Sequence, residues 1–437
     1  MAQPAGPPPP PPRLRRALGL WSVTTSGIGI VLGAGIYVLV GEAAADAGGA
    51  TWVAFLAAAL LAGVTAFTFA ELAGMFPEAG ASAVYAEEAF GARAGFVTGW
   101  LDVTVNVVGA GAVALGLGGY AQDLFGLEQR AVAAAVIAVC ALIVYVGVRE
   151  TAGLSMIFAG IEGGGLLLVI AVGLPDLPPP SFFDAPHGLS GILAATALVF
   201  FAYEGFEEMV SLSEETRDPT STIPRAVLLA VGVTSLFYLM VAMVATAVVP
   251  WEELAASSAP LALVVKTATH DRLGDVLSVI ALFATFNTVL LLLATGARIT
   301  YGMANRRLLP GVLARVSRRG TPLVATLTLS TIALGFMLSG NIGFVAQVTT
   351  FAVFGQFLAV NAAVIALRRS RADRVRPFRI RGTVAGMPVT ALIALGTTVL
   401  FVAFMDRGAL VTGVAALALG FLVSLLVLRG REAGVHR

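Results

Sequence analysis

The sequence predicts an all-helical integral membrane protein with twelve transmembrane helices, two of them broken near mid-membrane. Three observations predict this class. The 437 residues are 58% hydrophobic and 12% charged, with a mean hydropathy of +0.90, far from the composition of a soluble domain. Apolar runs of about 20 residues, the length that crosses a bilayer, recur along the chain. Glycines and carboxylates interrupt two of these runs.

Twelve apolar runs define the predicted spans. They cover residues 19–41, 50–75, 96–120, 129–148, 153–174, 189–212, 226–250, 273–302, 321–339, 342–367, 385–405 and 408–429. The Pro-rich and basic segment 1–18 is expected to be a disordered cytoplasmic tail, and 430–437 a second cytoplasmic tail. The connecting loops are too short for a soluble domain, so we expect the function to lie among the helices.

The basic residues support this topology. With the N-terminus inside, all but four of the 27 lysines and arginines fall in cytoplasmic segments, the exceptions being Arg130, Lys266, Arg272 and Arg407. This asymmetry follows the positive-inside rule, and a miscounted span would destroy it. We therefore expect a multi-pass protein of the cell membrane with both termini in the cytoplasm.

The first span contains an unusual glycine run, with Gly27, Gly29, Gly33 and Gly35 within nine residues. Each glycine costs a helix interior about 1 kcal/mol. A break here exposes N–H and C=O groups, which a membrane tolerates only where they face protein, a cavity or a ligand. The run therefore predicts a substrate site made of main chain. Close helix packing through Gly29 and Gly33 is the structural alternative.

A second interrupted span reads Phe200–Glu208, where Glu204 and Glu207 flank Gly205. An ionised carboxylate at the bilayer centre costs on the order of 3 kcal/mol, so these groups are not expected to face lipid. The two breaks fall in the first helix of each group of five. This pattern predicts a five-plus-five inverted repeat, with 19–174 and 189–367 as the repeats and two C-terminal helices at 385–429.

Short motifs in these segments resemble those of a known transporter family. The motifs are G-A-G-I-Y at Gly33–Tyr37, A-E-L-x-x-x-F-P-E-A-G at Ala70–Gly80, F-F-A-Y-E-G-F-E at Phe200–Glu207, E-E-T-R-D-P-T-S-T-I-P-R-A at Glu214–Ala226, and A-R-I-T-Y-G-M-A at Ala297–Ala304. In order and spacing the chain resembles an amino acid permease of the amino acid–polyamine–organocation (APC) superfamily of secondary transporters.

The resemblance implies a small amino acid or amine held between the two breaks. It implies that the substrate carboxylate accepts hydrogen bonds from the N–H groups of Gly33, Ala34 and Gly35, where a half-helix N-terminus favours an anion. The substrate ammonium would meet carbonyl groups, and an aromatic side chain would close over the site. The remaining residues expected at this site are Val31, Asn106, Phe201, Tyr203, Glu204 and Gly205.

Several polar residues are candidates for coupling. Glu162 lies about ten residues into the fifth span, where the resemblance implies a lysine in proton-coupled relatives, so this carboxylate could take up a proton, ligate sodium or play a structural role. Glu207 matches a position that is often acidic in the family, although it could equally tie down the broken backbone. The other candidates are Asp102, Thr285 and Asn287.

Together these features predict a secondary active transporter that works by alternating access, with proton symport favoured and sodium possible. Exchange of one amine for another is the alternative within the class, and a non-transporting sensor or a channel is the alternative outside it. We expect no enzyme activity, because the three histidines, His187, His270 and His436, lie in loops or the tail. No metal, cofactor or nucleic acid is expected, and the lipid bilayer is the one further partner.

Overall fold

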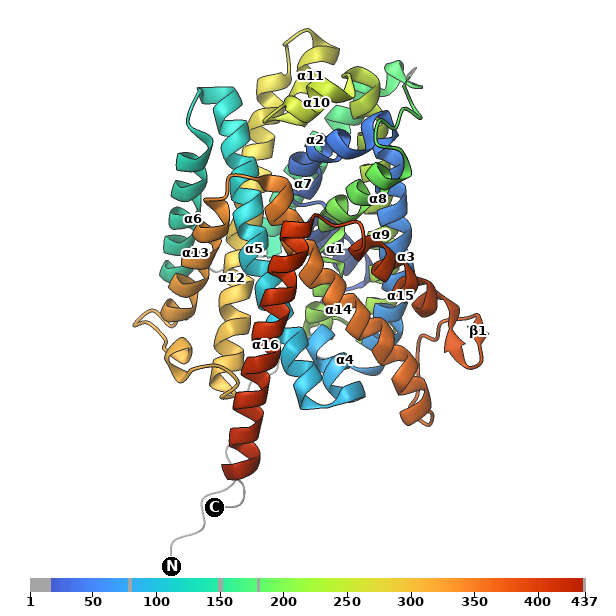
Figure 1. Ribbon diagram of the computed structural model, residues 1–437, viewed down its shortest axis with the longest axis vertical. Helices are drawn as coiled ribbons and strands as arrows, with labels where there is room; N and C mark the ends of the chain where they lie inside the picture. Colours follow the sequence, from blue (N-terminus) through green and yellow to red (C-terminus); the bar gives the residue numbers. More distant parts are fainter. Residues whose placement is uncertain (1–16, 78–80, 148–151, 179–180, 435–437) are drawn as a thin grey trace, which may run out of the picture.

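The computed structural model describes residues 17–77, 81–147, 152–178 and 181–434, and over these ranges it is almost entirely helical (Figure 1). Its only described strands are β1 (Thr383–Val384) and β2 (Met387–Pro388), which form one short antiparallel hairpin. The all-helical fold class is therefore confirmed. Residues 1–16 and 435–437 of the predicted tails lie outside the described residues, as do Glu78–Gly80 of the second motif.

The helices follow the predicted spans closely and add several short elements. The α-helices are α1 (Leu20–Val31), α2 (Gly35–Ala47), α3 (Thr51–Met75), α4 (Ala81–Phe90), α5 (Ala92–Phe125), α6 (Gln129–Val146), α7 (Ala152–Gly173), α8 (Gly188–Val199), α9 (Pro219–Val248), α10 (Trp251–Ala256), α11 (Pro260–Thr269), α12 (Gly274–Asn305), α13 (Leu323–Met337), α14 (Ile342–Ser370), α15 (Val389–Val402) and α16 (Arg407–Gly434). The 3₁₀ helices are η1 (Gly48–Ala50), η2 (Leu174–Asp176), η3 (Phe200–Tyr203), η4 (Phe206–Glu215) and η5 (Gly311–Ala314).

Nine stretches of the described residues are long and apolar enough to cross a membrane. One of them, Gly35–Met75, joins α2 and α3. Shorter apolar helices add to these at Leu20–Val31, Pro260–Thr269, Leu323–Met337 and Val389–Val402. The chain is thus a multi-pass membrane protein, while the count of twelve spans stays a prediction.

Local sequence explains several helix boundaries. The Glu128 side chain accepts hydrogen bonds from the N–H groups of Arg130 and Ala131 at 3.1 and 2.6 Å, which caps the start of α6. Asn341 caps α14 in the same way by accepting from the Phe344 N–H at 2.8 Å. At the end of α6, Gly147 adopts a φ of 85°, a left-handed conformation that favours glycine.

The buried side chains form two hydrophobic cores. One is centred on α3, α9 and α14, and the other on α5, α6, α12 and α13. In Figure 1 the helices α5, α6, α12 and α13 stand on the left, and α3, α9 and α15 on the right. The broken segments, α1–α2 and α8–η3–η4, lie between these two groups and contribute side chains to both cores.

One end of the molecule carries most of the described arginines, and we call it the arginine-rich end. It is the lower end in Figure 1, where α4, the end of α14 and the loop between α12 and α13 are found. Here Leu18 pairs with Thr216 in a single β-bridge, and the Arg217 N–H donates to the Leu18 carbonyl at 2.8 Å. The start of α1 is therefore held beside the end of η4.

A buried ion-pair cluster fixes α3 against α14 at this end. Arg368 donates from Nε and Nη2 to the two oxygens of Glu71 at 2.9 and 2.5 Å, and Arg376 Nε lies 3.3 Å from Glu71 Oε1. The Ile380 N–H also donates to Glu71, at 2.8 Å. The Glu71 carboxylate thus joins α3 to the end of α14 and to the segment that follows it.

Replacing Glu71 with glutamine is expected to lower the free energy of unfolding by about 3 to 5 kcal/mol, because it leaves two buried guanidinium groups without their carboxylate. The thermal unfolding midpoint in detergent measures the effect. Glu88→Gln is the matched control, since Glu88 forms an exposed pair with Arg371 at 3.3 Å, and such pairs contribute about 0 to 1 kcal/mol. Equal midpoints for the two variants would contradict the prediction.

Candidate substrate site

The first break separates α1, which ends at Val31, from α2, which begins at Gly35. The Ala34 N–H donates to Thr288 Oγ1 of α12 at 3.2 Å instead of continuing the helix. Gly35 packs directly on the second break, because a Cβ atom added to it would lie 2.5 Å from Ala202 Cα. No side chain fits there, which explains why this residue is glycine.

The second break interrupts the helix that begins with α8. The chain passes through η3, is extended at Glu204, and turns at Gly205, whose φ of 111° strongly favours glycine. The Glu207 carboxylate accepts a hydrogen bond from the Gly205 N–H at 3.1 Å and so holds the turn. The ten residues that follow form the 3₁₀ helix η4, an unusually long run for this geometry.

Buried tyrosines satisfy carbonyl groups around the breaks. Tyr238 of α9 donates to the Val31 carbonyl at 2.5 Å, and Tyr37 donates to the Glu162 carbonyl at 2.6 Å. Tyr120 of α5 donates in turn to the Tyr37 carbonyl at 2.7 Å. These bonds provide partners for backbone groups that hydrocarbon cannot satisfy.

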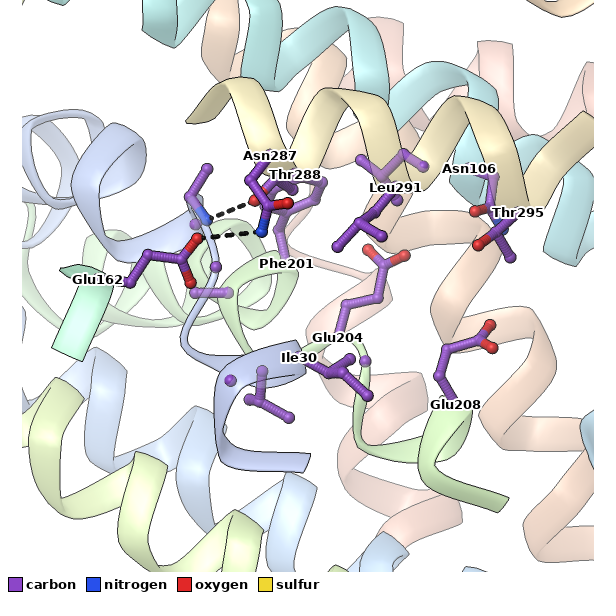
Figure 2. A pocket seen from close by; sticks show the side chains of 18 of the residues that line it. Ile30, Asn106, Glu162, Phe201, Glu204, Glu208, Asn287, Thr288, Leu291 and Thr295 are labelled. Atoms are coloured by element: carbon purple, nitrogen blue, oxygen red, sulfur yellow. Dashed lines mark hydrogen bonds between the residues drawn. The ribbon is translucent and has the colours of Figure 1, made fainter. Parts of the chain in front are cut away.

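A cavity of about 220 Å³ lies between the two breaks and α12 (Figure 2). It is lined by Gly29, Ile30, Val31, Gly33, Ala34, Gly35, Asn106, Glu162, Phe201, Ala202, Glu204, Gly205, Glu208, Ser211, Asn287, Thr288, Leu291, Leu292 and Thr295. Exposed Ser211 of η4 is among them, and η4 runs from the second break to the Leu18–Thr216 bridge at the arginine-rich end. The cavity therefore extends from the breaks toward that end.

Three carboxylates line the cavity, and none of the described lining residues is a lysine or an arginine. Figure 2 shows Glu162 near Asn287 and Thr288, Glu208 near Asn106 and Thr295, and Glu204 between them. Uncompensated carboxylates in a membrane interior are costly and attract cations. The arrangement is therefore suited to a positively charged ligand.

Glu162 is the most deeply buried of the three, with a relative exposure of 1%. Its Oε1 accepts a hydrogen bond from Asn287 Nδ2 at 3.3 Å, while its Oε2 has no partner among the described residues. A buried carboxylate oxygen without a partner indicates a place for a proton or a cation.

Most of the residues expected at the substrate site line this cavity. They are Val31, Gly33, Ala34, Gly35, Asn106, Phe201, Glu204 and Gly205, together with the coupling candidates Glu162 and Asn287.

The four other expected residues lie outside the lining of the cavity. Tyr203 donates to the Phe55 carbonyl at 3.0 Å, Glu207 holds the Gly205 turn, and Thr285 donates to the Ala281 carbonyl within its own helix at 2.6 Å. Asp102 accepts from Asn106 Nδ2 at 3.3 Å.

The lining also includes residues that sequence reasoning did not single out. These are Ile30, Ala202, Glu208, Ser211, Thr288, Leu291, Leu292 and Thr295, whereas Gly29 of the lining belongs to the predicted glycine run. Thr288, Leu291, Leu292 and Thr295 recur at intervals of three and four, so they share one face of α12. Counting helical turns from the candidate Asn287 would have predicted this face of α12 from the sequence.

A multi-pass membrane protein with a polar cavity between two interrupted helices has the construction of a membrane transporter. The chain belongs to the Amino acid permease family, whose model matches residues 18–426. Membership of the APC superfamily is thus confirmed, and the family consists of transporters, with no catalytic family indicated.

Known relatives cover nearly the whole chain. It is 29% identical to the methylthioribose transporter of Bacillus subtilis (strain 168) over 95% of this chain and 94% of that protein. It is 27% identical to the branched-chain amino acid permease BcaP of the same organism over 90% of this chain and 88% of that protein. It is 30% identical to cationic amino acid transporter 4 of Mus musculus over 82% of this chain and 61% of that protein.

Proposed function

We propose that this protein is a secondary active transporter of amino acids or related amines, with a preference for substrates that carry an additional positive charge. The observation that carries the proposal is the cavity between the two helix breaks, which combines backbone donors with three carboxylates and no described basic side chain. The named relatives include a branched-chain amino acid permease and a cationic amino acid transporter, which supports an amine substrate.

The two ends of an amino acid find different partners in this cavity. At the start of α2 the first N–H groups have no carbonyl of their own helix to bind, and the helix dipole adds positive potential, so a carboxylate is favoured there. Substrate carboxylate would compete with Thr288 Oγ1 for the Ala34 N–H. Glu204 and Glu208 lie farther along the cavity, where a cationic side chain would reach them.

Alternating access accounts for the position of the cavity. Ser211 of η4 extends the lining from the second break toward the arginine-rich end, which we assign to the cytoplasm by the positive-inside rule. On this assignment the position of the cavity supports an inward-facing state of a cell-membrane protein with both termini inside. The two hydrophobic cores would move against each other about the breaks, within the proposed five-plus-five repeat and twelve spans.

Glu162 is the proposed coupling group, and proton symport is the favoured mode. Its Oε2, which has no partner among the described residues, supports this role, because a proton bound there would lie in the cavity beside the first break. Asn287 orients the carboxylate through the hydrogen bond to Oε1. Glu207, by contrast, is occupied in holding the Gly205 turn.

Uptake into proteoliposomes tests the function. We expect lysine, arginine or a diamine to be taken up, or to compete for uptake, better than leucine. Glu204→Gln and Glu208→Gln should each lower the apparent affinity for the cationic substrate at least about tenfold, because a hydrogen bond to a charged group contributes about 1.5 to 3 kcal/mol. Leucine affinity serves as the internal control and should change far less.

The same assay distinguishes symport from exchange. Uptake driven by an imposed pH gradient into empty vesicles indicates symport, and uptake that requires substrate preloaded inside indicates exchange. If no amine or amino acid is bound or moved under either condition, the proposed function is wrong.

A further inference from the structure

A second cavity lies at the arginine-rich end, remote from the helix breaks. Its volume is about 340 Å³, and its lining is Arg368, Ala372, Arg374, Arg376, Arg379 and Gly386. The end of α14, the end of α3 and the β1–β2 hairpin meet here; Figure 1 shows the hairpin projecting sideways from the body. Four of the six lining residues are arginines, so the cavity is suited to an anion.

The buried part of this cluster carries excess positive charge. Arg368 and Arg376 share the single carboxylate of Glu71, and the side chains of these three residues are only 5%, 8% and 0% exposed. Two guanidinium groups and one carboxylate leave a net charge of +1 on side chains that are almost fully buried, which is costly unless an anion compensates it. Arg368 Nη1 is buried and has no partner among the described residues.

Arg374 and Arg379 add two exposed guanidinium groups to the same cavity. Arg374 is held in place, since it stacks 3.9 Å above the Phe76 ring and donates from Nη2 to the Met75 carbonyl at 3.0 Å. The surrounding segment 368–381 contains seven arginines and one carboxylate, Asp373. These exposed arginines therefore add to the positive charge of the buried pair, Arg368 and Arg376.

Exposed apolar side chains lie next to the cavity, as expected for a site at the level of lipid headgroups. Phe378 stacks on exposed Phe67 of α3, with ring centroids 6.5 Å apart. Phe67 lies eight residues, or about 12 Å, before the end of α3, so the segment that contains Phe378 packs along the side of this apolar helix. Val375 and Val384 are 79% and 60% exposed beside the arginines, as expected for side chains that contact the edge of the acyl region.

We propose that this cavity binds the phosphate headgroup of an anionic phospholipid. Guanidinium groups match phosphate geometry with two parallel hydrogen bonds, and Arg368, whose Nη1 has no partner among the described residues, lines the cavity. Basic pockets between helices on the cytoplasmic side are suited to anionic headgroups in general. The inference is independent of the transported substrate.

Native mass spectrometry of the full chain in detergent tests the proposal, with phosphatidylglycerol, phosphatidylcholine and inorganic phosphate as separate probes. We expect phosphatidylglycerol to bind in preference to phosphatidylcholine, and Arg374→Gln/Arg379→Gln to weaken its binding roughly 30-fold, since each basic residue contributes about fivefold. Arg379→Gln alone keeps the Arg374 contacts and is expected to lose about fivefold. Glu71, Arg368 and Arg376 are unchanged in both variants.

Arg315→Gln/Arg318→Gln is the matched control, because it removes two exposed arginines from the loop between α12 and α13 at the same end. It should leave phosphatidylglycerol binding within about twofold of wild type, since distant exposed charges are screened. Equal losses in the two double variants, or equal binding of both lipids, would overturn the proposal. Displacement of the lipid by equimolar inorganic phosphate would assign the cavity to a soluble phosphate and also overturn it.

Discussion

Gly35→Ala is expected to abolish most substrate uptake, because Gly35 is the point where the two broken helices touch. A Cβ atom at this position would lie 2.5 Å from Ala202 Cα and 2.7 Å from Ala202 Cβ, and a backbone atom cannot move aside as the end of a side chain can. Overpacking of this kind costs about 1 to 3 kcal/mol, which corresponds to about a 5- to 150-fold change in an equilibrium constant. Initial uptake rates and substrate affinity measure the effect.

Gly63→Ala is the matched control for this prediction. Gly63 also lies within a helix, α3, but a Cβ atom added there meets nothing within 4 Å. Alanine should be neutral or stabilise the protein by up to about 1 kcal/mol, because it is the better helix former. Wild-type uptake by Gly35→Ala at equal expression would show that the contact between the breaks does not shape the site.

Glu162→Gln is expected to remove the stimulation of uptake by an inward pH gradient. Glutamine fills the same space and its Oε1 can still accept from Asn287, but its side chain cannot release a proton. The variant therefore imitates a permanently protonated carboxyl group. The measurement is the ratio of uptake with and without the imposed gradient, which should fall to about one if Glu162 is the group that carries the proton.

Glu252→Gln serves as the control, since Glu252 is an exposed carboxylate on α10 at the opposite end of the molecule. It should keep the wild-type response to the gradient. An unchanged gradient response in Glu162→Gln would remove Glu162 from coupling. Repeating the assay with a sodium gradient identifies which cation the carboxylate serves.

The positions of the breaks could be predicted from the sequence because glycine has a distinct backbone cost. The run up to Gly35 and the isolated Gly205 mark the places where α1 gives way to α2 and η3 to η4. The helix bounds also follow the apolar runs, with differences of a few residues at most ends. The short helix α4 was not predicted, since its ten residues mix apolar and charged side chains.

Glu204 of the second break was expected at the site and lines the cavity, but the position of Glu208 in the lining could not be predicted. The family resemblance drew attention to Glu207, whereas Glu208 lines the cavity. The reason is the 3₁₀ geometry of η4, in which residues three apart lie on one line, so Gly205, Glu208 and Ser211 share a face. Local propensity does not distinguish 3₁₀ from α geometry over ten residues, and tertiary contacts decide it.

The tyrosine hydroxyl groups around the breaks have a consequence for the energetics of substrate binding. Because Tyr238 binds the Val31 carbonyl and Thr288 binds the Ala34 N–H, both backbone groups have protein partners at the first break before a substrate replaces Thr288. An arriving substrate does not have to unwind a helix. In the proposed alternating-access cycle, more of its binding free energy is then available for closing the protein around it, a benefit of preorganisation.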